Sequence, residues 1–490
     1  MKFRHAKIVC TLGPASDSLP MITRLMRAGM DVARLNFSHG THEGHAGLIG
    51  RLREASGKLQ KPIALVADLQ GPKIRTGLLV DGQPVHLRAG QRFTISTDGA
   101  AGTSAGVSTT YRRLPQEVKR GDRILLADGL IELRVKSSGR TEIICEVSNG
   151  GDLGQNKGIN LPGVHLRVPA LTPKDREDLA FALSHGANYI AVSFIRRGED
   201  VRTVRAAIAR AGSTTPIIVK LEKPEAIDNL DEILTLADGV MVARGDLGVE
   251  MNPERVPVVQ KHVIARARDA RRPVITATQM LESMIENPRP TRAEASDVAN
   301  AVFDGTDALM LSAETASGRY PVESVQMMDR IIAEAEAHIG QYPRPAPHRL
   351  DVAETTAELI CHASEELQMK VIAVFTQTGP TARLVSKHRP RPPVVAFSPV
   401  QTTRRMMSLY WGVLPRTIGT IRSLEDLEEM AERRLIEEGL VRRGDVIGIV
   451  AGTPFNVGGT TNFMKFHVVG TPANGASPQI SGKLKPRDSA

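Results

Sequence analysis

Short apolar runs alternate along the chain with stretches whose apolar residues recur at helical spacing. The first runs predict three strands, at Lys7–Thr11, Val32–Asn36 and Ile63–Asp68. Amphipathic helices are expected between them, at Leu19–Met30 and His42–Leu59. The same alternation resumes after residue 163 and predicts five more strands: Tyr189–Phe194, Ile217–Glu222, Gly239–Arg244, Val274–Thr278 and Ala308–Ser312. Eight such units predict an α/β fold, a (β/α)8 TIM barrel, over residues 1–70 and 165–342.

Between the third and fourth of these strands the helical spacing disappears. Residues 77–154 alternate short strand-like segments with Gly, Asp and Ser turns, and we expect no helix there. The predicted strands are His86–Leu87, Arg92–Ser96, Arg123–Ala127, Ile131–Val135 and Thr141–Val147. We therefore predict that residues 71–164 form an inserted all-β domain, a small β-barrel that acts as a lid.

The last third repeats the α/β pattern independently of the barrel. Strands are expected at Val371–Thr376, Val394–Phe397 and Asp445–Ala451. The Pro-rich segment Tyr342–His348 predicts a linker before them. These features predict a C-terminal α/β regulatory domain over residues 350–470 and a disordered tail over residues 471–490.

Composition and charge narrow the choice of partners. The chain has 490 residues and a formal charge of +9, but its Lys and Arg residues are dispersed and aromatic residues make up 3%. Proteins that stack nucleic-acid bases need aromatic side chains. We therefore expect this protein to bind anionic small molecules rather than nucleic acid. No apolar run is long enough for a membrane span and no signal peptide is recognisable. Three widely spaced cysteines suit a reducing compartment, and we expect a cytoplasmic protein.

Polar residues gather where the predicted barrel strands end. On a strand, residues i and i+2 share a face, which pairs Arg34 with Asn36, Lys220 with Glu222, and Arg244 with Asp246. Two further polar residues, Asp68 and Thr278, close other strands. Such residues could be ion pairs that close the end of a barrel. Their recurrence on five strands at the end where barrel enzymes hold substrate favours an active site.

The types of side chain at these strand ends indicate a chemistry. Carboxylates such as Glu222 and Asp246 suit a hard divalent cation, Mg2+ or Mn2+. Cations beside them suit a phosphate or carboxylate group of the substrate. The sequence therefore predicts metal-assisted chemistry on an anionic substrate, with phosphoryl transfer as the favoured reaction.

Other motifs give little further evidence of function. The sequence contains neither a P-loop nor the G-x-G-x-x-G fingerprint. His39, His42 and His45 are spaced three apart, and we interpret them as solvated histidines at a helix start rather than as a metal cluster.

At these residues the sequence resembles pyruvate kinase over nearly its whole length. The likeness is carried by Arg34-Leu-Asn36-Phe-Ser38-His39-Gly40, Lys220-Leu-Glu222, Ala243-Arg244-Gly245-Asp246 and the block from Ala277-Thr278 to Glu294. The resemblance implies that the enzyme transfers the phosphoryl group of phosphoenolpyruvate to ADP, giving pyruvate and ATP in the last step of glycolysis.

The resemblance also implies roles for single residues. Glu222 and Asp246 would hold the divalent ion, and Lys220 would stabilise charge on the phosphoryl group and the enolate. Arg34 would bind phosphate, whereas Gly245, Asp246 and Thr278 would hold the carboxylate. Thr278 also matches the position at which the family protonates the enolate. The nucleotide-side positions are His39, Arg75 and Lys157.

One departure from the family pattern concerns K+. Many members hold K+ with residues like Asn36, Ser38 and Asp68 and the carbonyl at position 69, here Leu69, beside an acidic residue that is Lys73 in this chain. We expect the Lys73 ammonium to replace the cation, so that K+ is not required. The alternative is an ordinary K+ site with a surface lysine nearby.

The C-terminal domain carries a second candidate site. Thr376, Gln377, Thr378, Gly379 and Thr381 follow a predicted strand and lead into a helix, where hydroxyl and N–H groups could bind phosphate. In the family this region resembles the pocket for activating sugar phosphates, so we expect a phosphorylated sugar or nucleotide to regulate the enzyme allosterically. A capped helix with a polar loop is the alternative. Family analogy implies a homotetramer.

Two other functions compete with this interpretation. A metal-dependent aldolase or lyase could use similar carboxylates, but it gives no reason for the inserted domain and the third domain. A non-catalytic descendant that binds metabolites or nucleic acid would have no need to keep Lys220, Glu222, Asp246 and Thr278.

Overall fold

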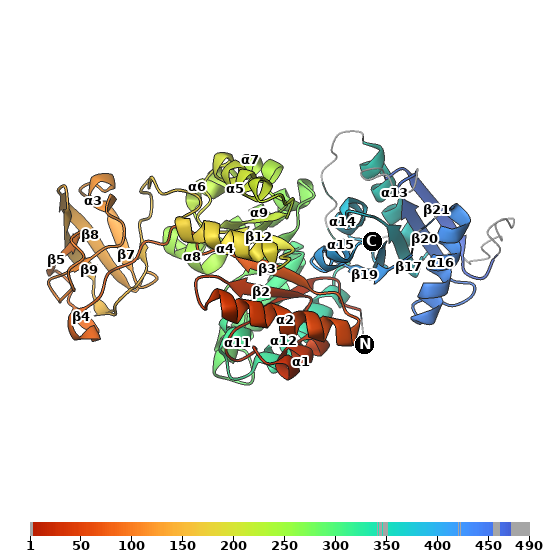
Figure 1. Ribbon diagram of the computed structural model, residues 1–490, viewed down its shortest axis with the longest axis horizontal. Coiled ribbons are helices and arrows are strands. Elements are labelled where there is room, and N and C mark those ends of the chain that lie inside the picture. The colour runs from red at the N-terminus through yellow and green to blue at the C-terminus, as the bar shows by residue number, and fades with distance from the viewer. Residues whose placement is uncertain are drawn as a thin grey trace. The chain divides into compact units, whose positions relative to one another are not determined.

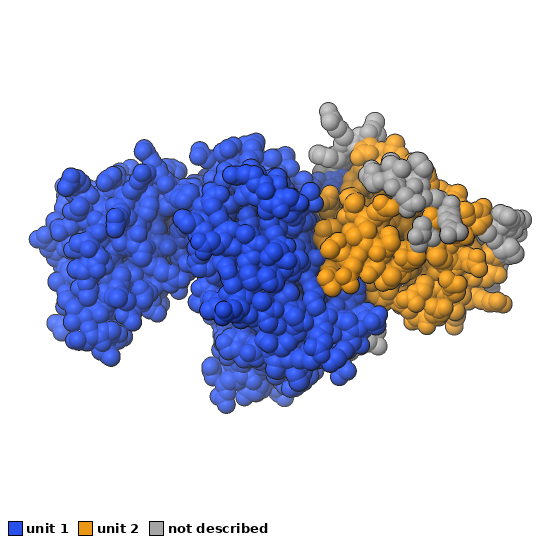
Figure 2. Space-filling model, in the orientation of Figure 1, with its two compact units in different colours: residues 1–343 blue, residues 344–490 orange. Residues whose placement is uncertain are grey.

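The computed structural model describes residues 3–340, 342, 345, 351–419, 421, 423–453 and 461–471. The chain divides into two units, residues 1–343 and 344–490 (Figure 2). Residues 472–490 of the predicted tail and most of the predicted linker Tyr342–His348 lie outside the described residues. Within the described residues, no helix is both long enough and apolar enough to cross a membrane.

Eight parallel strands of the first unit close into a barrel, as predicted. Their order around the barrel is β1-β16-β15-β14-β13-β12-β3-β2. The strands are β1 (Lys7–Thr11), β2 (Val32–Asn36), β3 (Ala64–Asp68), β12 (Tyr189–Val192), β13 (Ile217–Leu221), β14 (Gly239–Ala243), β15 (Val274–Ala277) and β16 (Ala308–Leu311). Six of them are buried at every position, which explains their unbroken apolar runs.

Helices separate these strands in sequence and surround the barrel (Figure 1). The first half contributes α1 (Leu19–Ala28), α2 (His42–Leu59), α4 (Pro173–Ser184), α5 (Gly198–Arg210), α6 (Pro224–Asp228) and α7 (Leu230–Leu236). The second half contributes α8 (Arg244–Glu250), α9 (Val256–Asp269), α10 (Arg292–Asp304), α11 (Ala313–Ala316) and α12 (Pro321–Ala337). Helix α2 has the predicted bounds, and Thr41 caps its first turn by accepting from the Gly44 N–H.

The segment between β3 and α4 is rich in strands, as predicted, and we call residues 71–164 the β-rich insertion. Its six-stranded sheet has the order β11-β7-β8-β9-β5-β6, and β10 pairs with β4 separately. The strands are β4 (Val85–Leu87), β5 (Arg92–Ser96), β6 (Gly106–Ser108), β7 (Arg123–Leu126), β8 (Ile131–Ser138), β9 (Glu142–Asn149), β10 (Gly151–Leu153) and β11 (Ile159–Asn160). Side chains such as Phe93, Leu133 and Ile143 form its own apolar core.

Some elements of the β-rich insertion were not predicted. Strands β6, β10 and β11 have two or three residues each, which is too short for an alternating pattern to be recognised. The expectation that this segment contains no helix was wrong, because Leu114–Glu117 forms the single turn α3, with Pro115 in its first turn.

The chain enters the β-rich insertion through a glycine that no other residue could replace without strain. Gly71 has φ +70°, and a Cβ there would lie 2.9 Å from the Phe194 ring and 3.0 Å from the Ser193 Cβ. Its N–H donates to the Asp175 carboxylate at 3.0 Å. Asp175 also forms the capping box of α4 with Thr172, so one buried carboxylate links the entry of the insertion to its return.

The second unit has a five-stranded sheet of order β19-β18-β17-β20-β21. Its strands are β17 (Val371–Phe375), β18 (Val394–Ser398), β19 (Val413–Thr417), β20 (Val446–Ala451) and β21 (Phe463–Val468). The helices are α13 (Val352–Glu366), α14 (Pro380–Lys387), α15 (Gln401–Met407) and α16 (Leu424–Glu437). Strand β21 runs antiparallel to β20 at the edge of the sheet, and it was not predicted because its residues are half-buried or exposed except for His467.

A buried lysine lies at the amino end of β1, on the opposite face of the barrel from the carboxyl ends of the strands. Lys7 is 4% exposed. Burial lowers the pKa of Lys7 from 10.5 to about 8, although the nearby Asp31 carboxylate favours the charged form. Asp31 itself accepts from the Arg4 guanidinium at 2.8 Å and from the Ile8 N–H at 3.0 Å.

This lysine makes the stability of the first unit depend on pH. Below about pH 8 the folded state must keep Lys7 charged, and this penalty disappears as the pH rises toward 10.5, where the unfolded lysine also loses its proton. The penalty is roughly 1.4 kcal/mol for each unit of pKa difference. Between pH 7 and 10 the free energy of unfolding should therefore rise in the parent relative to Lys7→Met, as measured by urea denaturation. The exposed Lys58→Met is the control, and equal slopes for the parent and Lys7→Met would contradict the prediction.

Candidate active site

The ammonium of Lys220 lies at the carboxyl end of β13 among three oxygen partners. Its Nζ is 2.7 Å from Glu222 Oε1, 2.8 Å from Ser193 Oγ and 3.5 Å from Asp68 Oδ1. Burial alone would lower the pKa of Lys220, but the carboxylates of Asp68 and Glu222 outweigh it and raise the pKa above its usual range. Lys220 is therefore held protonated in a fixed position.

A second cation lies beside Lys220 and shares one of its partners. Arg34, on β2, donates from Nε to Asp68 Oδ2 at 2.7 Å and from Nη1 to Thr11 Oγ1 at 2.9 Å. Asp68 is 1% exposed and ends the neighbouring strand β3. One buried carboxylate thus orients both the guanidinium and the ammonium.

The carboxylates of Glu222 and Asp246 lie close enough for their charges to interact. Glu222 is 2% exposed, and its Oε2 accepts from the Phe194 N–H at 3.0 Å. Burial raises the pKa of Glu222 and the charge of Asp246 raises it further, while Lys220 opposes both effects. The Asp246 carboxylate thus adds to the larger effect of burial in favouring the protonated form of Glu222.

This donor set fits a hard divalent cation. Both groups are carboxylates, and a cation between them would relieve the repulsion that raises the pKa of Glu222. Across the described residues no group of three or more His, Cys, Asp or Glu side chains could hold a metal ion. The remaining ligands would have to be oxygen atoms of substrate or water.

Thr278 follows β15 in a conformation that is unusual for a β-branched residue. Its φ is +66° and that of Gln279 is +53°. The Thr278 hydroxyl accepts from the Gly245 N–H at 2.8 Å and donates to the Ala277 carbonyl at 2.6 Å. The strained turn thus fixes a hydroxyl next to the first turn of α8, which carries Asp246.

Arg244 has a different position from the one predicted. It was expected to share a strand face with Asp246, but β14 ends at Ala243 and both residues belong to helix α8. Its guanidinium donates to the Ala277 and Thr278 carbonyls at 3.2 and 2.7 Å, and it pairs with Asp297 at 2.6 Å. Arg244 therefore supports the Thr278 turn, and its charge is not free for substrate.

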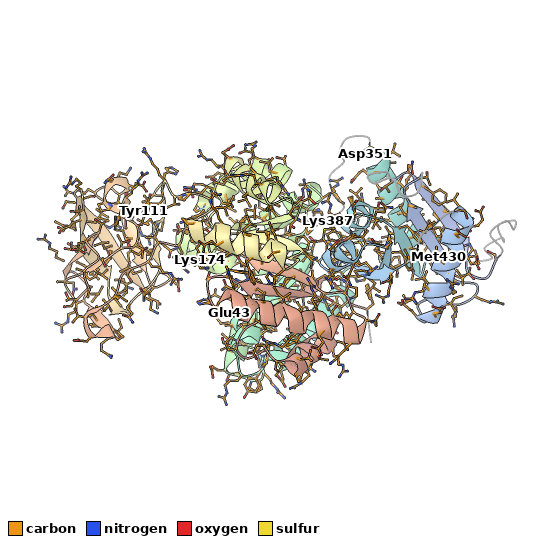
Figure 3. All side chains as sticks on the ribbon, in the orientation of Figure 1. Glu43, Tyr111, Lys174, Asp351, Lys387 and Met430 are labelled. Carbon is orange, nitrogen blue, oxygen red and sulfur yellow. The ribbon has the colours of Figure 1, made fainter. Side chains whose placement is uncertain are left out.

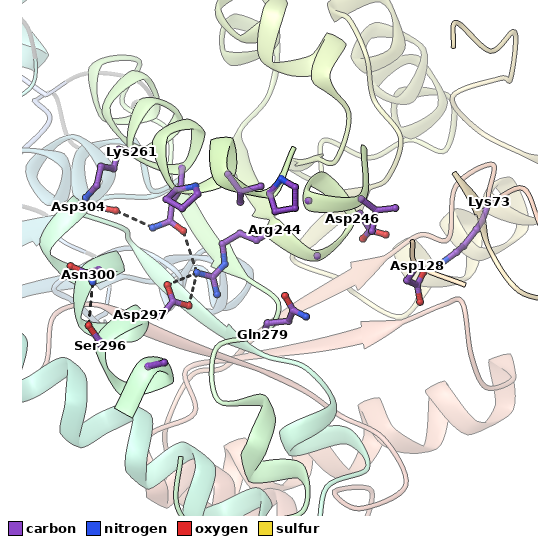
Figure 4. A pocket seen from close by; sticks show the side chains of 18 residues that line it. Lys73, Asp128, Arg244, Asp246, Lys261, Gln279, Ser296, Asp297, Asn300 and Asp304 are labelled. Carbon is purple, nitrogen blue, oxygen red and sulfur yellow. Dashed lines mark hydrogen bonds and ion pairs between the residues drawn. The ribbon is translucent and has the colours of Figure 1, made fainter. Parts of the chain in front are cut away.

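A cavity of about 1060 Å³ lies beside this turn (Figure 4). Gly245, Asp246, Arg244 and Lys73 line it together with Asp128 of the β-rich insertion. Its volume is at the upper end of the range for ligand-binding clefts.

The residues predicted to form or replace a K+ pocket are only partly brought together. Asn36 Oδ1 accepts from the Ser38 N–H at 3.1 Å, and the Leu69 carbonyl accepts from Ser193 Oγ at 3.1 Å. Lys73 lies near Asp128 in Figure 4 and forms no ion pair with any described residue. The replacement of K+ by Lys73 remains a prediction.

The three predicted nucleotide-side residues fall into two places. Arg75 pairs with Gly158 in an isolated antiparallel bridge, and its Nη1 donates to the Asn156 carbonyl at 3.0 Å, so Arg75 and Lys157 are neighbours. His39 is exposed in the loop after β2, and in the described part of the chain no hydrogen bond or ion pair joins it to the other two.

The interpretation of the three histidines as solvated was wrong for His45, which is 7% exposed. Its Nε2 lies 2.9 Å from the His39 carbonyl and its ring packs at 4.5 Å from Phe37. His42 Nε2 lies 2.7 Å from Asp178, which also pairs with Lys174. Figure 3 labels Lys174 on α4. These histidines pack the loop after β2 against α4.

Several polar groups of the predicted effector segment already form local hydrogen bonds. Thr376 Oγ1 accepts from the Gly379 N–H at 2.9 Å, and the Thr381 and Thr461 hydroxyls lie 2.7 Å apart. The Gln377 carbonyl accepts from Thr403 at 2.7 Å. Thr378 is exposed at the start of α14. Residues 454–460, just before Thr461, lie outside the described residues.

A closed barrel with an ammonium, a guanidinium and paired carboxylates at its carboxyl rim defines a barrel enzyme suited to an anionic substrate. The chain matches the family descriptions "Pyruvate kinase, barrel domain" over residues 3–325 and "Pyruvate kinase, alpha/beta domain" over residues 354–467. The chain belongs to the pyruvate kinase family and is a phosphotransferase.

Individual relatives agree with this assignment. The chain is 45% identical over 474 residues to pyruvate kinases of Staphylococcus aureus strains MRSA252 and COL, covering 95% of this chain and 81% of each relative. The crystal structure of a pyruvate kinase from Cryptosporidium parvum superposes with a TM-score of 0.89 at 38% identity, covering 95% of this chain and 96% of that chain. The family favours phosphoryl transfer over the aldolase, lyase and non-catalytic alternatives.

Sequence reasoning missed Ser193, which follows β12 and joins the Leu69 carbonyl to Lys220. A signal existed, since this serine lies at the end of a predicted strand on the same rim. Thr11, Phe194 and Asp297 were also missed; their contacts depend on tertiary structure.

Ser193→Ala should lower kcat/KM for phosphoryl transfer about tenfold, because Lys220 would lose a charge-assisted hydrogen bond. Steady-state kinetics would measure this change. Ser184→Ala, on the exposed side of α4, is the matched control and should behave like the parent. Unchanged kinetics for Ser193→Ala would show that the two carboxylates alone position Lys220.

Proposed function

We propose that this enzyme transfers the phosphoryl group of phosphoenolpyruvate to ADP, giving pyruvate and ATP in the last step of glycolysis. The observation that carries the proposal is the protonated Lys220, held between Glu222, Ser193 and Asp68 at the carboxyl rim. Phosphoryl transfer needs positioned positive charge more than covalent help, and Lys220 and Arg34 supply it from the protein.

We assign the other roles from the same geometry. Glu222 and Asp246 would hold Mg2+ or Mn2+, which when bound neutralises the charge of the transferring group. Arg34 binds the phosphate of the substrate. The backbone around Gly245 and Asp246, at the start of α8, binds its carboxylate together with Thr278, and the Gly245 N–H would exchange its bond to the Thr278 hydroxyl for one to the substrate. We assign to Thr278 the role of holding a proton for the enolate, and the bond of its hydroxyl to the Ala277 carbonyl supports this role by setting the direction of the hydroxyl.

The nucleotide and the β-rich insertion belong to the same proposal. Arg75 and Lys157 lie side by side where the insertion joins the barrel, and with His39 they are proposed to contact ADP. The insertion acts as a lid that excludes water during transfer. Residues 1–70 and 165–342 are the proposed catalytic domain and residues 350–470 the regulatory domain. A cytoplasmic homotetramer is proposed by analogy with the family.

We further propose that K+ is dispensable. Two observations support this: the Lys73 ammonium lines the same cavity as Asp246, and Asp68 already pairs with Arg34 and faces Lys220. The protein therefore supplies two fixed cations, Lys220 and Arg34, and a third in Lys73, which lines the cavity.

The first test is pyruvate release from phosphoenolpyruvate and ADP with Mg2+ in a buffer free of K+ and NH4+. We expect turnover in the parent and a loss of at least about a hundredfold in Lys220→Met, because removing one preorganised donor costs this much in comparable sites. Strong, saturable activation by added K+ would contradict the role of Lys73 alone. No turnover under either condition would contradict the reaction.

The effector proposal rests on the exposed Thr378 at the start of α14. A phosphorylated sugar or nucleotide that activates the parent should shift its half-saturating phosphoenolpyruvate concentration at least about fivefold, the lower end of typical allosteric coupling. Thr378→Ala should reduce this shift, because it removes a hydroxyl donor, while Thr402→Ala on the neighbouring α15 should not. A capped helix without a ligand is the correct interpretation if no such compound changes the parent's response.

A further inference from the structure

One buried carboxylate joins the β-rich insertion to the barrel beside the proposed metal site. Glu250, at the carboxyl end of α8, is 4% exposed. Its Oε1 accepts from Asn160 Nδ2 of strand β11 at 2.8 Å and from Lys223 Nζ at 2.6 Å. One oxygen atom therefore connects a side chain of the insertion with a lysine of the barrel rim.

The two barrel residues of this contact, Lys223 and Glu250, are each linked to a proposed metal ligand. Lys223 follows Glu222 in sequence and is 9% exposed. Its Nζ lies 5.5 Å from the Phe194 ring centroid, and the Phe194 N–H donates to Glu222 at 3.0 Å. Phe194 itself has φ +59°, so this contact is fixed by a strained backbone.

The second connection runs through helix α8. This helix begins with Arg244, Gly245 and Asp246 and ends with Glu250, so its two ends carry a proposed metal ligand and the contact with Asn160. The seven residues of α8 make about two helical turns, whose backbone hydrogen bonds keep its two ends at a set separation. A displacement of Asn160 would thus act on Glu222 through Lys223 and on Asp246 through α8.

We propose that Asn160, Glu250 and Lys223 form a latch that couples the position of the β-rich insertion to divalent-cation binding at Glu222 and Asp246. The inference rests on the proposed function only in placing the cation at those two carboxylates. Glu250 and Lys223 are positioning residues, since they act through their neighbours. When the insertion moves away from the barrel, Asn160 no longer donates to Glu250. Lys223 then remains paired with the buried Glu250 carboxylate.

The coupling is reciprocal, because two linked equilibria must change each other by the same factor. A hydrogen bond to a charged group corresponds to roughly a tenfold change in an equilibrium constant. Breaking the bond between Asn160 and Glu250 should therefore shift the insertion toward its displaced position and weaken cation binding by up to that factor.

Asn160→Ala tests the latch without removing a buried charge. Its control is Asn149→Ala, which removes a hydrogen bond from Asn149 to the Leu130 carbonyl inside the insertion. Cys10, Cys145 and Cys361 are all buried, so cysteines introduced at the exposed Arg140 and Arg210 can be spin-labelled selectively. Electron paramagnetic resonance then measures the distance between insertion and barrel, and with Mn2+ it measures cation affinity without turnover.

We expect Asn160→Ala to lengthen or broaden the label distance and to weaken Mn2+ binding up to about tenfold, with Asn149→Ala like the parent. Asn160→Asp has the same shape and places a second carboxylate against Glu250, so it should act in the same direction and more strongly. An unchanged distance or an unchanged Mn2+ affinity in both Asn160 variants would overturn the latch. If the parent bound no Mn2+, the metal site of the proposed function would fail, and the coupling with it.

Discussion

The site depends on a buried ammonium that is surrounded by more negative than positive charge. Lys220 could not remain charged in the interior without Asp68 and Glu222, and Lys220 in turn opposes the burial that favours the protonated form of Glu222. Arg34 shares Asp68 and extends the same arrangement to β2. The remaining negative charge, on the side of Asp246, is what makes the rim receptive to a cation.

The barrel determines where these charges meet. Strands β2, β3, β12, β13, β14 and β15 are consecutive neighbours around the barrel. Their carboxyl ends carry or precede Arg34, Asp68, Ser193, Lys220, Asp246 and Thr278. In the register, Asn36 lies beside Asp68, and Asp68 lies beside Ala191, two residues before Ser193. The proposed site therefore occupies one continuous arc of the rim, although its residues span most of the first unit in sequence.

Periodicity predicted the barrel because its strands are buried on both faces and its helices are amphipathic, so both leave long patterns in the sequence. The i and i+2 rule paired Lys220 with Glu222 correctly, because Lys220 lies near the end of β13 and Glu222 directly follows the strand. It failed for Arg244, since the strand ends one residue earlier and the next turn is helical. Ser193 and Asp297 act through contacts with distant segments, and no local pattern records such contacts.

Short strands and single turns were also beyond prediction, because two or three residues cannot show a period. The same limit applies to His45, whose burial results from Phe37 and the His39 carbonyl rather than from its helix position. What a sequence predicts well is therefore the scaffold and the types of group at its rim. The partner that each group finds depends on tertiary packing.

The entry to the β-rich insertion has an evolutionary consequence. Gly71 leaves no room for a side chain beside Ser193 and Phe194, and its N–H is bound to the residue that caps α4. The point where the insertion joins the barrel is thus built into the wall of the site. Exchange of this module between related barrels, by recombination or by engineering, would succeed only at boundaries that keep Gly71 and Asp175 together in one parent.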